Sequence, residues 1–566
     1  MSIAATIPRT AAGRNVDSYL LIGLLTGYAL FLFLTIIVPL VLILLRSTQD
    51  REGNFVGLAN YQAYFSSTSL VNSLGHSLFV STITTVIVLA LAFCYAYALC
   101  RTAMPWRPFF KLMAMAPLLM PGLLKAVALI YWFGNQGVLK SLLMGESVYG
   151  PIGIVMASTL WTLPHAIMLL SAAMMLSDAR LFEAAACLKA SPLRTFLTVT
   201  LPSVRYGLIS TGIFVFIRVL TDFGIPKVIG GNYNVLATDI YKEVVGQQNF
   251  EMGAVVSIML LIPALIAFVI DRFIAGGRGE GLTARSVPLE PKPSRGIDLA
   301  FFLYCTAISL LSLSVIIMGQ MAALFRFWPY NLSLTLDHYS FDMQGVSWEN
   351  FTNSLIFAFF VATWGTLVTF VSAYLVEKPL AHPGARAVLH AVALVPMAVP
   401  GLVLGLGYLF FVNAPGNPLG VLYGTITLLV INTVSHYYTV THLTARTALK
   451  QLDQEFEAVA ASLKAPLWQT FLRVTVPICS PAILDIWVYL FLNAMTTVSG
   501  VIFLYGINSS LAALAVVHMD EAGRLASAAA MGTLIVYASI IVRLLHVYVS
   551  RLILKRTGQW RRRADD

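Results

Sequence analysis

Leu188-Lys-Ala-Ser-Pro-Leu-Arg-Thr-Phe-Leu-Thr-Val-Thr-Leu-Pro202 returns 275 residues later as Leu463-Lys-Ala-Pro-Leu-Trp-Gln-Thr-Phe-Leu-Arg-Val-Thr-Val-Pro477. The two copies are identical at nine of fifteen positions. Each copy is polar enough to lie outside a membrane, yet each lies between long apolar runs. The pattern predicts an internal repeat with one structured loop in each half. Two equivalent loops suggest two docking points for a two-fold partner.

Composition places most of the chain in a lipid bilayer. Of the 566 residues, 58% are hydrophobic and 11% are charged, whereas soluble proteins carry about 25% charged residues. The apolar runs continue for roughly 18 positions or more, the length that a membrane-spanning helix needs. Strands of a β-barrel would alternate apolar and polar residues, so an all-α polytopic membrane protein is predicted. The net charge of +10 comes from basic loops on one side of the membrane, and not from a nucleic-acid interface.

Twelve spans are predicted, six in each half. They lie at about 18–45, 75–100, 109–133, 151–176, 204–221 and 254–275, then at about 298–325, 352–376, 387–412, 420–444, 480–505 and 527–550. Basic residues gather in every second loop, which places these loops and both termini in the cytosol. The first repeat covers 1–275, a cytosolic linker 276–297, and the second repeat 298–566. Equal span numbers that start from the same side make the repeats parallel.

Other matched segments support the duplication. Asn72-Ser73-Leu74 corresponds to Asn353-Ser354-Leu355, and Pro121-Gly122-Leu123 in the third span corresponds to Pro400-Gly401-Leu402. Proline removes a backbone hydrogen bond and permits a bend. Pro121, Gly122, Pro400 and Gly401 are therefore candidate hinges, with a static kink filled by a neighbouring helix as the alternative.

The repeated loop has the composition of a docking element. Asp178 opens a stretch of helix formers that ends before Leu201-Pro202, which predicts a short amphipathic helix, a turn and a return to the membrane. Phe182 and Leu188 are too apolar for a freely solvated loop. A helix lying flat on lipid headgroups is the alternative, but a second copy at the same topological place favours a protein partner.

The loop resembles that of a known family. Glu183-Ala184-Ala185, Leu188-Lys189-Ala190 and Leu201-Pro202 are similar to the "EAA" loop of permeases of binding-protein-dependent ABC importers. The resemblance implies a type I ABC importer-like fold and a coupling helix that docks on a separate ATPase subunit. The coupling residues it implies are Glu183, Ala184, Ala185, Leu188, Lys189, Ala190, Glu457, Ala458, Leu463, Lys464 and Ala465.

The second copy departs from the family pattern. Lys189 and Lys464 replace the glycine that usually follows the leucine. Ala458 stands where Glu183 does, and Glu457 comes one residue earlier. The contact of a glutamate with the ATPase is therefore expected from the first copy, while the role of Glu457 stays open.

The fused, two-repeat chain resembles permeases for ferric iron, thiamine or 2-aminoethylphosphonate. The segments 220–231 and 234–241 are most similar to the 2-aminoethylphosphonate permeases. The implied function is the transmembrane permease subunit of an ATP-driven importer, which moves 2-aminoethylphosphonate or a related phosphonate delivered by an external binding protein. Ferric iron and thiamine are the alternatives.

Polar residues within spans are costly and mark a candidate substrate pathway. Arg218 and Asn493 stand at equivalent positions, and Lys125 and Asp222 complete the set. An ion pair between Arg218 and Asp222, and a Lys125 side chain that reaches the outer interface, are the alternatives. A phosphonate anion would suit the two cations, whereas bare ferric iron would prefer Tyr, His or carboxylate ligands.

The partners follow from the resemblance. They are two copies of a cytosolic ATPase, which carries the ATP and Mg, an extracytoplasmic solute-binding protein, and the lipid of a bacterial inner membrane. This chain is expected to bind no cofactor or metal, because its five cysteines have no paired spacing and it has no phosphate-binding Gly-rich loop. It is therefore not expected to be an enzyme. The rival from another class is a secondary transporter of the major-facilitator type, which would need ion-coupling acids inside its bundle.

Overall fold

The computed structural model describes residues 11–276, 291, 293–341, 345–378, 382–453, 455–463 and 465–564. The chain packs as two compact units that do not follow the sequence repeats. Unit 1 contains Met1–Leu45, Thr352–Leu511 and Tyr537–Asp566, and unit 2 contains Arg46–Phe351 and Ala512–Val536. The first span therefore packs with the second repeat, and the seventh span packs with the first repeat.

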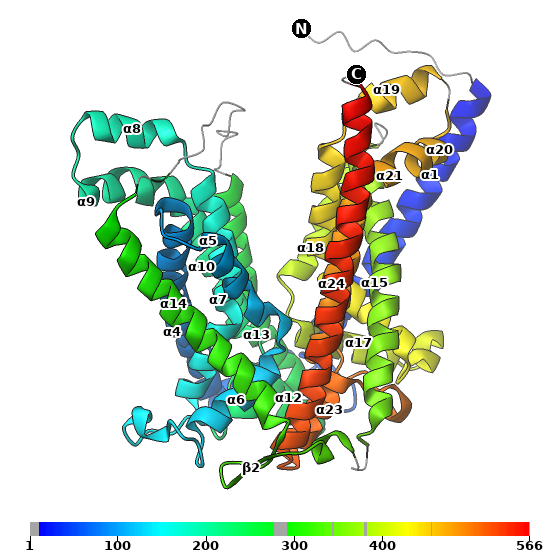
Figure 1. Ribbon diagram of the computed structural model, residues 1–566. Helices are drawn as coiled ribbons and strands as arrows, with labels where there is room; N and C mark the ends of the chain where they lie inside the picture. The colour runs from blue at the N-terminus through cyan, green and yellow to red at the C-terminus, as the bar shows by residue number, and fades with distance from the viewer. Residues whose placement is uncertain are drawn as a thin grey trace. The chain divides into compact units, whose positions relative to one another are not determined.

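Unit 2 holds most of the first repeat. Its helices are α3 (Ala59–Ser66), α4 (Thr68–Arg101), α5 (Arg107–Met115), α6 (Gly122–Phe133), α7 (Pro151–Met175), α8 (Ala179–Cys187), α9 (Pro192–Thr195), α10 (Leu201–Leu220), α11 (Gly224–Ile229), α12 (Leu236–Tyr241), α13 (Phe250–Gly276), α14 (Arg295–Ala322) and α23 (Ala512–Glu521). The short hairpin β1 (Phe325–Phe327) and β2 (Asn331–Leu334) is antiparallel. In Figure 1, α8 and α9 lie at one end of this unit, and α6 and β2 lie toward the other.

Unit 1 repeats this order with helices from the second half. They are α1 (Ala11–Leu32), α2 (Val38–Arg46), α15 (Trp348–Glu377), α16 (Pro383–Ala393), α17 (Gly401–Val412), α18 (Ile426–Lys450), α19 (Glu455–Ser462), α20 (Leu467–Thr470), α21 (Val476–Ile478), α22 (Ser480–Thr496) and most of α24 (Leu525–Ala564). The π-helical turns η4 (Phe196–Thr200) and η9 (Phe471–Thr475) follow α9 and α20 at matching places in the two units. The all-α, two-repeat architecture is confirmed.

Eight described helices are long and apolar enough to cross a membrane, or up to eleven if three bent helix pairs each count as one span. The twelfth predicted span corresponds to α18, which is long enough but does not pass the test. Its polar side chains face the protein interior: Asn432 donates to the Gly500 carbonyl over 2.8 Å, and Thr439 donates to the Ala393 carbonyl over 2.8 Å. A helix buried among other helices can carry polar groups that lipid would reject, and composition alone therefore misjudges it.

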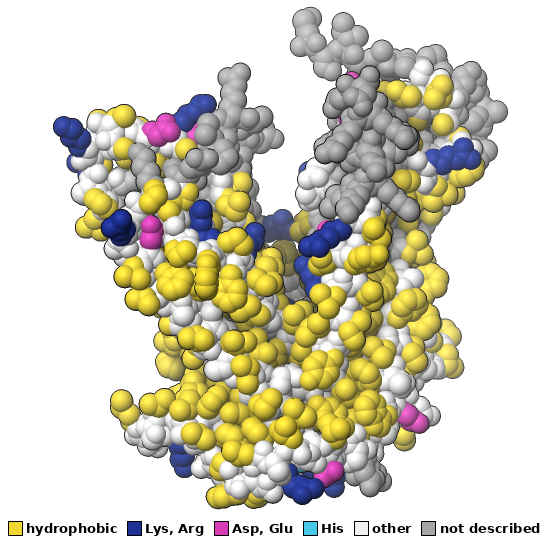
Figure 2. Space-filling model, viewed as in Figure 1, with side chains coloured by type: hydrophobic (Ala, Val, Ile, Leu, Met, Phe, Trp, Pro, Cys, Tyr) yellow, Lys and Arg dark blue, Asp and Glu magenta, His cyan; other side chains and the backbone are white. Residues whose placement is uncertain are grey.

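Hydrophobic side chains cover the middle of the visible face of each unit, and most charged side chains lie toward the ends (Figure 2). Hydroxyl groups inside the spans bond to their own helix. In α4, Ser77 donates to the Ser73 carbonyl over 2.8 Å, and Ser81 donates to the Ser77 carbonyl over 2.7 Å. Such bonds satisfy polar groups where no water is present.

The two third spans are sharply broken. The helices on either side of Pro121 are bent by 98°, and those on either side of Pro400 by 110°. Each proline caps the helix that follows, α6 or α17, with extended backbone. The predicted bends are therefore present at both places. Whether they move is a separate question, because Gly122 and Gly401 pack closely against neighbouring side chains.

Both exchanged spans make specific contacts within their units. In unit 2, α14 packs on α4, α5 and α6, and the Tyr304 hydroxyl donates to the Leu91 carbonyl over 2.8 Å. In unit 1 the first span reaches α17, where a Cβ built on Gly407 would lie 2.7 Å from the carbonyl oxygen of Pro39. Only glycine permits this approach of backbone to helix.

Candidate functional site

The two repeated loops begin in the same way. Asp178 precedes α8, and its side chain accepts a hydrogen bond from the Arg180 amide over 3.1 Å. Asp453 precedes α19 and accepts from the Glu455 amide over 3.0 Å. An acidic side chain at this position satisfies a free amide and suits the positive end of the helix dipole. The sequence therefore starts both helices at equivalent residues.

The two loops also end in the same way. The Ala190 amide donates to the Ala185 carbonyl over 3.0 Å, and the Ala465 amide donates to the Ala460 carbonyl over 2.9 Å. This bond belongs to a common helix ending in which one residue adopts the left-handed conformation. Lys189 is that residue in the first copy, with φ of +52°. The conformation explains why a glycine is usual there. Lys464 lies outside the described residues.

Replacing Lys189 by glycine is expected to raise the free energy of unfolding by about 0.5–1 kcal/mol, because glycine adopts positive φ without a steric penalty. Thermal unfolding of the purified protein in detergent measures the change. Replacing Lys189 by alanine is the control, since it removes the charge and keeps the Cβ. Equal unfolding temperatures for the two variants would contradict the argument.

The predicted coupling residues divide by exposure. Glu183, Ala184, Leu188, Lys189, Ala458 and Leu463 are exposed; Ala190, Glu457 and Ala465 are half-buried; and Ala185 is buried. The exposed leucines are unusual for an aqueous surface, with Leu188 82% and Leu463 76% exposed. Each loop therefore presents apolar side chains that remain uncovered within its own unit. Such surfaces mark sites of protein or membrane contact.

Glu457 does not lie like Glu183. Its carboxylate is 2.7 Å from the Lys378 ammonium, whereas Glu183 makes no side-chain hydrogen bond or ion pair within the described part of the chain. Ala458, and not Glu457, occupies the place that corresponds to Glu183. The one-residue shift seen in the sequence is therefore a real difference between the two loops.

The predicted polar residues of unit 2 gather around the end of α10. Arg218 places its guanidinium 4.6 Å from the centre of the Trp161 ring. Asp222 accepts a hydrogen bond from the Ile225 amide over 3.1 Å and so caps α11. No ion pair joins Arg218 to Asp222 among the described residues. The alternative of an internal salt bridge is therefore wrong.

Lys125 is also in this group, and it does not reach the outer interface. It is 1% exposed, and its ammonium donates to the Met120 carbonyl over 2.9 Å. Arg218, Asp222 and His165 lie within electrostatic range of it. The sequence did not single out Trp161, although its position one turn before His165 on α7 places it beside the cluster.

In unit 1 the equivalent residues are uncharged. The Asn493 side chain donates to the Tyr489 carbonyl over 2.8 Å, and the Tyr489 ring lies 6.1 Å from that of Tyr437. A Cβ built on Gly401 would lie 3.2 Å from His436, just as one on Gly122 would lie 3.9 Å from Trp161 in the other unit. His436 and Trp161 are 275 positions apart, so the repeat offset could have paired them.

Comparison with known families decides the identity. Residues 101–276 and 381–555 each match the binding-protein-dependent transport system inner membrane component family. The chain belongs to this family. Both matches contain a coupling loop and the bent third span of their half. The protein is therefore a multi-pass inner-membrane permease subunit of an ABC importer, with an ATPase and a solute-binding protein as partners, and not a major-facilitator transporter.

Relatives of the permease cover both repeats. A protein of Haemophilus influenzae named as a candidate ferric transport system permease, FbpB 1, is 31% identical over 77% of this chain and 70% of its own length. The ferric transport system permease FbpB of Actinobacillus pleuropneumoniae is 27% identical over 92% of this chain and 77% of its own. The Fe(3+)-transport system permease FbpB 2 of Haemophilus influenzae is 23% identical over 93% of this chain and 98% of its own.

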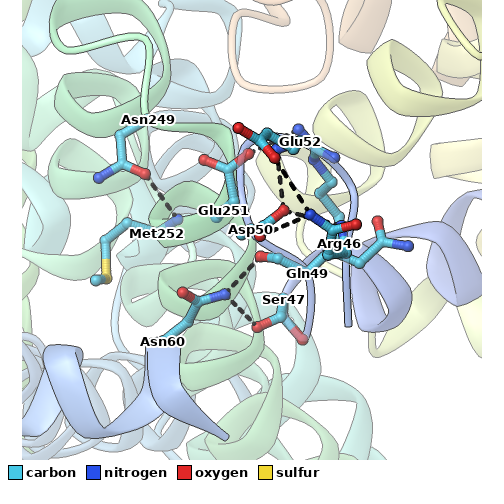
Figure 3. Close-up of polar contacts among 10 residues, drawn as sticks. Arg46, Ser47, Gln49, Asp50, Glu52, Asn60, Asn249, Glu251 and Met252 are labelled. Carbon is cyan, nitrogen blue, oxygen red and sulfur yellow. Dashed lines mark hydrogen bonds and ion pairs between the residues drawn. The ribbon is translucent and has the colours of Figure 1, made fainter. Parts of the chain in front are cut away.

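The permease orders one of its outer loops by polar contacts (Figure 3). Arg46, at the end of the first span, forms an ion pair of 2.7 Å with Glu251, and Asn60 donates to the Ser47 and Gln49 carbonyls over 3.0 and 2.8 Å. Within the loop, hydrogen bonds from Asn54 to the exposed Asp50 carboxylate hold the pKa of Asp50 below its usual value. The loop is therefore built as a defined surface and not as a loose tether.

Proposed function

We propose that the permease imports ferric iron. The observation that carries this proposal is the extent of the matches: relatives named for ferric transport align with both repeats of one fused chain, over 92% and 93% of its length. A likeness over one repeat would reflect only the general permease architecture. Likeness over the whole fused chain extends to the arrangement that distinguishes this group.

The two cations that favoured a phosphonate give less support to that cargo once their contacts are known. Arg218 lies over Trp161, and Lys125 is bonded to a backbone carbonyl and buried. An anionic cargo would have to displace these contacts or attract the cations across them. The relatives reported above are named for iron and not for phosphonate or thiamine. Ferric iron, the alternative of the sequence analysis, is therefore the preferred cargo.

The proposed mechanism needs no chemistry in this chain. Two ATPase copies bind the exposed faces of α8 and α19 on the cytosolic side, where both termini also lie, and they carry the ATP and Mg. Closure of the ATPase pair moves the coupling helices, and the broken third spans at Pro121-Gly122 and Pro400-Gly401 bend to admit iron from the external binding protein. Lys125, Arg218, Asp222 and Asn493 line the pathway.

The cargo is tested in vesicles that contain the permease with its ATPase and its binding protein. Radioactive ferric iron, supplied on the binding protein, is expected to accumulate only with ATP inside the ATPase compartment. Excess 2-aminoethylphosphonate is expected to leave that uptake unchanged. Uptake of labelled 2-aminoethylphosphonate without uptake of iron would overturn the ferric proposal and restore the phosphonate one.

A further inference from the structure

Each coupling helix is joined to the second span of its own half by one basic side chain. We propose that Arg101 and Lys378 are positioning residues that transmit the movement of α8 and α19 into the spans. In this scheme Glu457 serves Lys378 and does not bind the ATPase. The proposal rests on the proposed function, because it requires an ATPase that moves the helices.

In unit 2, Arg101 is the last residue of α4 and contacts two other elements. Its guanidinium donates to the Met174 carbonyl, in the last turn of α7, over 2.9 Å. It also lies 4.5 Å from the centre of the Phe182 ring on α8. A planar guanidinium can bond through its edge and stack through its face at the same time. One side chain therefore joins the second span, the fourth span and the coupling helix.

In unit 1, Lys378 makes the same three-way connection. It follows α15 directly, and its ammonium donates to the Leu452 carbonyl just after α18 over 3.5 Å. The same ammonium lies 2.7 Å from the Glu457 carboxylate on α19, and the Lys378 side chain is only 8% exposed. The second span, the fourth span and the coupling helix again meet at one cation.

The aromatic contacts beside these cations show that the two junctions are equivalent. In unit 2, the Tyr97 ring on α4 lies 6.4 Å from Phe196. In unit 1, the Tyr374 ring on α15 lies 4.8 Å from Phe471. Tyr97 and Tyr374 each stand four residues before the cation of their span. The two cations are therefore matched by structure, although a single sequence offset does not align them.

The two junctions differ in the partner on the coupling helix. Phe182 and Glu457 stand at corresponding places, 275 residues apart, so a cation–π contact in one half replaces an ion pair in the other. This difference accounts for the shifted glutamate of the second loop. Glu457 completes a junction that Phe182 completes with its ring, and it is bonded inward at the place where Glu183 is free to face outward.

The test exchanges the charges of the second junction in the complete transporter, reconstituted in vesicles with its ATPase and binding protein. Lys378→Glu and Glu457→Lys alone are each expected to lower the iron transported per ATP hydrolysed by about tenfold, a typical size for coupling between sites. Co-purification of the ATPase is expected to stay at the wild-type level in both. The double variant is expected to recover most of the lost ratio, because the opposite charges meet again.

Two further variants guard against simple unfolding. Glu457→Gln keeps the shape of the side chain and removes its charge, and it is expected to lower the same ratio. Glu455→Gln removes an exposed charge from the same helix and is expected to behave as wild type. In the first half, Phe182→Glu is expected to be tolerated, because the new carboxylate faces Arg101, while Phe182→Leu is expected to reduce the ratio.

The outcomes separate the two proposals. Unchanged ratios in the single variants, a double variant no better than either single, or loss of ATPase binding in Glu457→Gln would overturn the positioning role. Wild-type vesicles that hydrolyse ATP without moving iron would instead contradict the cargo. Stimulation of ATP hydrolysis by the binding protein would then supply the same comparison among the variants.

Discussion

Replacing Glu183 by arginine is expected to leave the permease folded and to reduce iron uptake by about tenfold or more. Glu183 is exposed on α8, so the change in folding stability should stay within about 0.5 kcal/mol. A charge reversal in the middle of a protein interface commonly costs several kcal/mol of binding energy, from repulsion and from loss of the original contact. Co-purification of the ATPase and uptake into vesicles measure the two effects.

Ala458 provides the matched comparison. It occupies the corresponding place on α19 and is also exposed, but no glutamate contact exists there to be lost. Ala458→Glu is therefore expected to retain most of the ATPase binding, since it installs on α19 the acid that α8 already carries. Full ATPase binding and full uptake by the Glu183→Arg variant would exclude α8 as a docking helix.

Replacing Gly407 by valine is expected to remove most of the folded permease from the membrane. The added side chain would strike the backbone of Pro39, whose carbonyl oxygen lies only 2.7 Å from a Cβ at this position. Overpacking of a well-packed interior costs about 1–3 kcal/mol, and here the contacted atom is backbone, which yields little. Membrane yield and the unfolding temperature in detergent report the loss.

The same substitution at Gly27 is the control for this prediction. Gly27 lies on α1, in the same exchanged first span, and a Cβ built there meets nothing within 4 Å. Gly27→Val should keep the wild-type yield, within about 0.5 kcal/mol of stability. A Gly407→Val variant as stable as Gly27→Val would show that the first span does not pack on α17.

The sequence was sufficient for the features that depend on local chemistry. The duplicated loop, its acidic start at Asp178 and Asp453, and the breaks at Pro121 and Pro400 follow from residues that act on their own neighbours. Helix caps and proline bends need no knowledge of distant contacts. The family and its two-repeat architecture could therefore be predicted from short motifs and apolar runs.

The features that the sequence missed depend on partners far along the chain. Glu457 gave no sign that its partner would be Lys378, because the two residues approach only when α15 and α19 pack together. Arg218 and Asp222 have the spacing of a helical ion pair, but Trp161 and the α11 amide are better placed to contact them. The cargo was misjudged for the same reason, since the availability of Lys125 and Arg218 was assumed.

The exchange of first spans has a consequence for how such a protein is made. Residues Met1–Leu45 pack with Thr352–Leu511, which the ribosome completes much later. The earliest segment to enter the bilayer must therefore wait, with its contact face uncovered, until most of the chain has been synthesised. A gene divided at the linker would give two polypeptides that mature only when they are produced together, and fusion into one reading frame guarantees equal amounts of both.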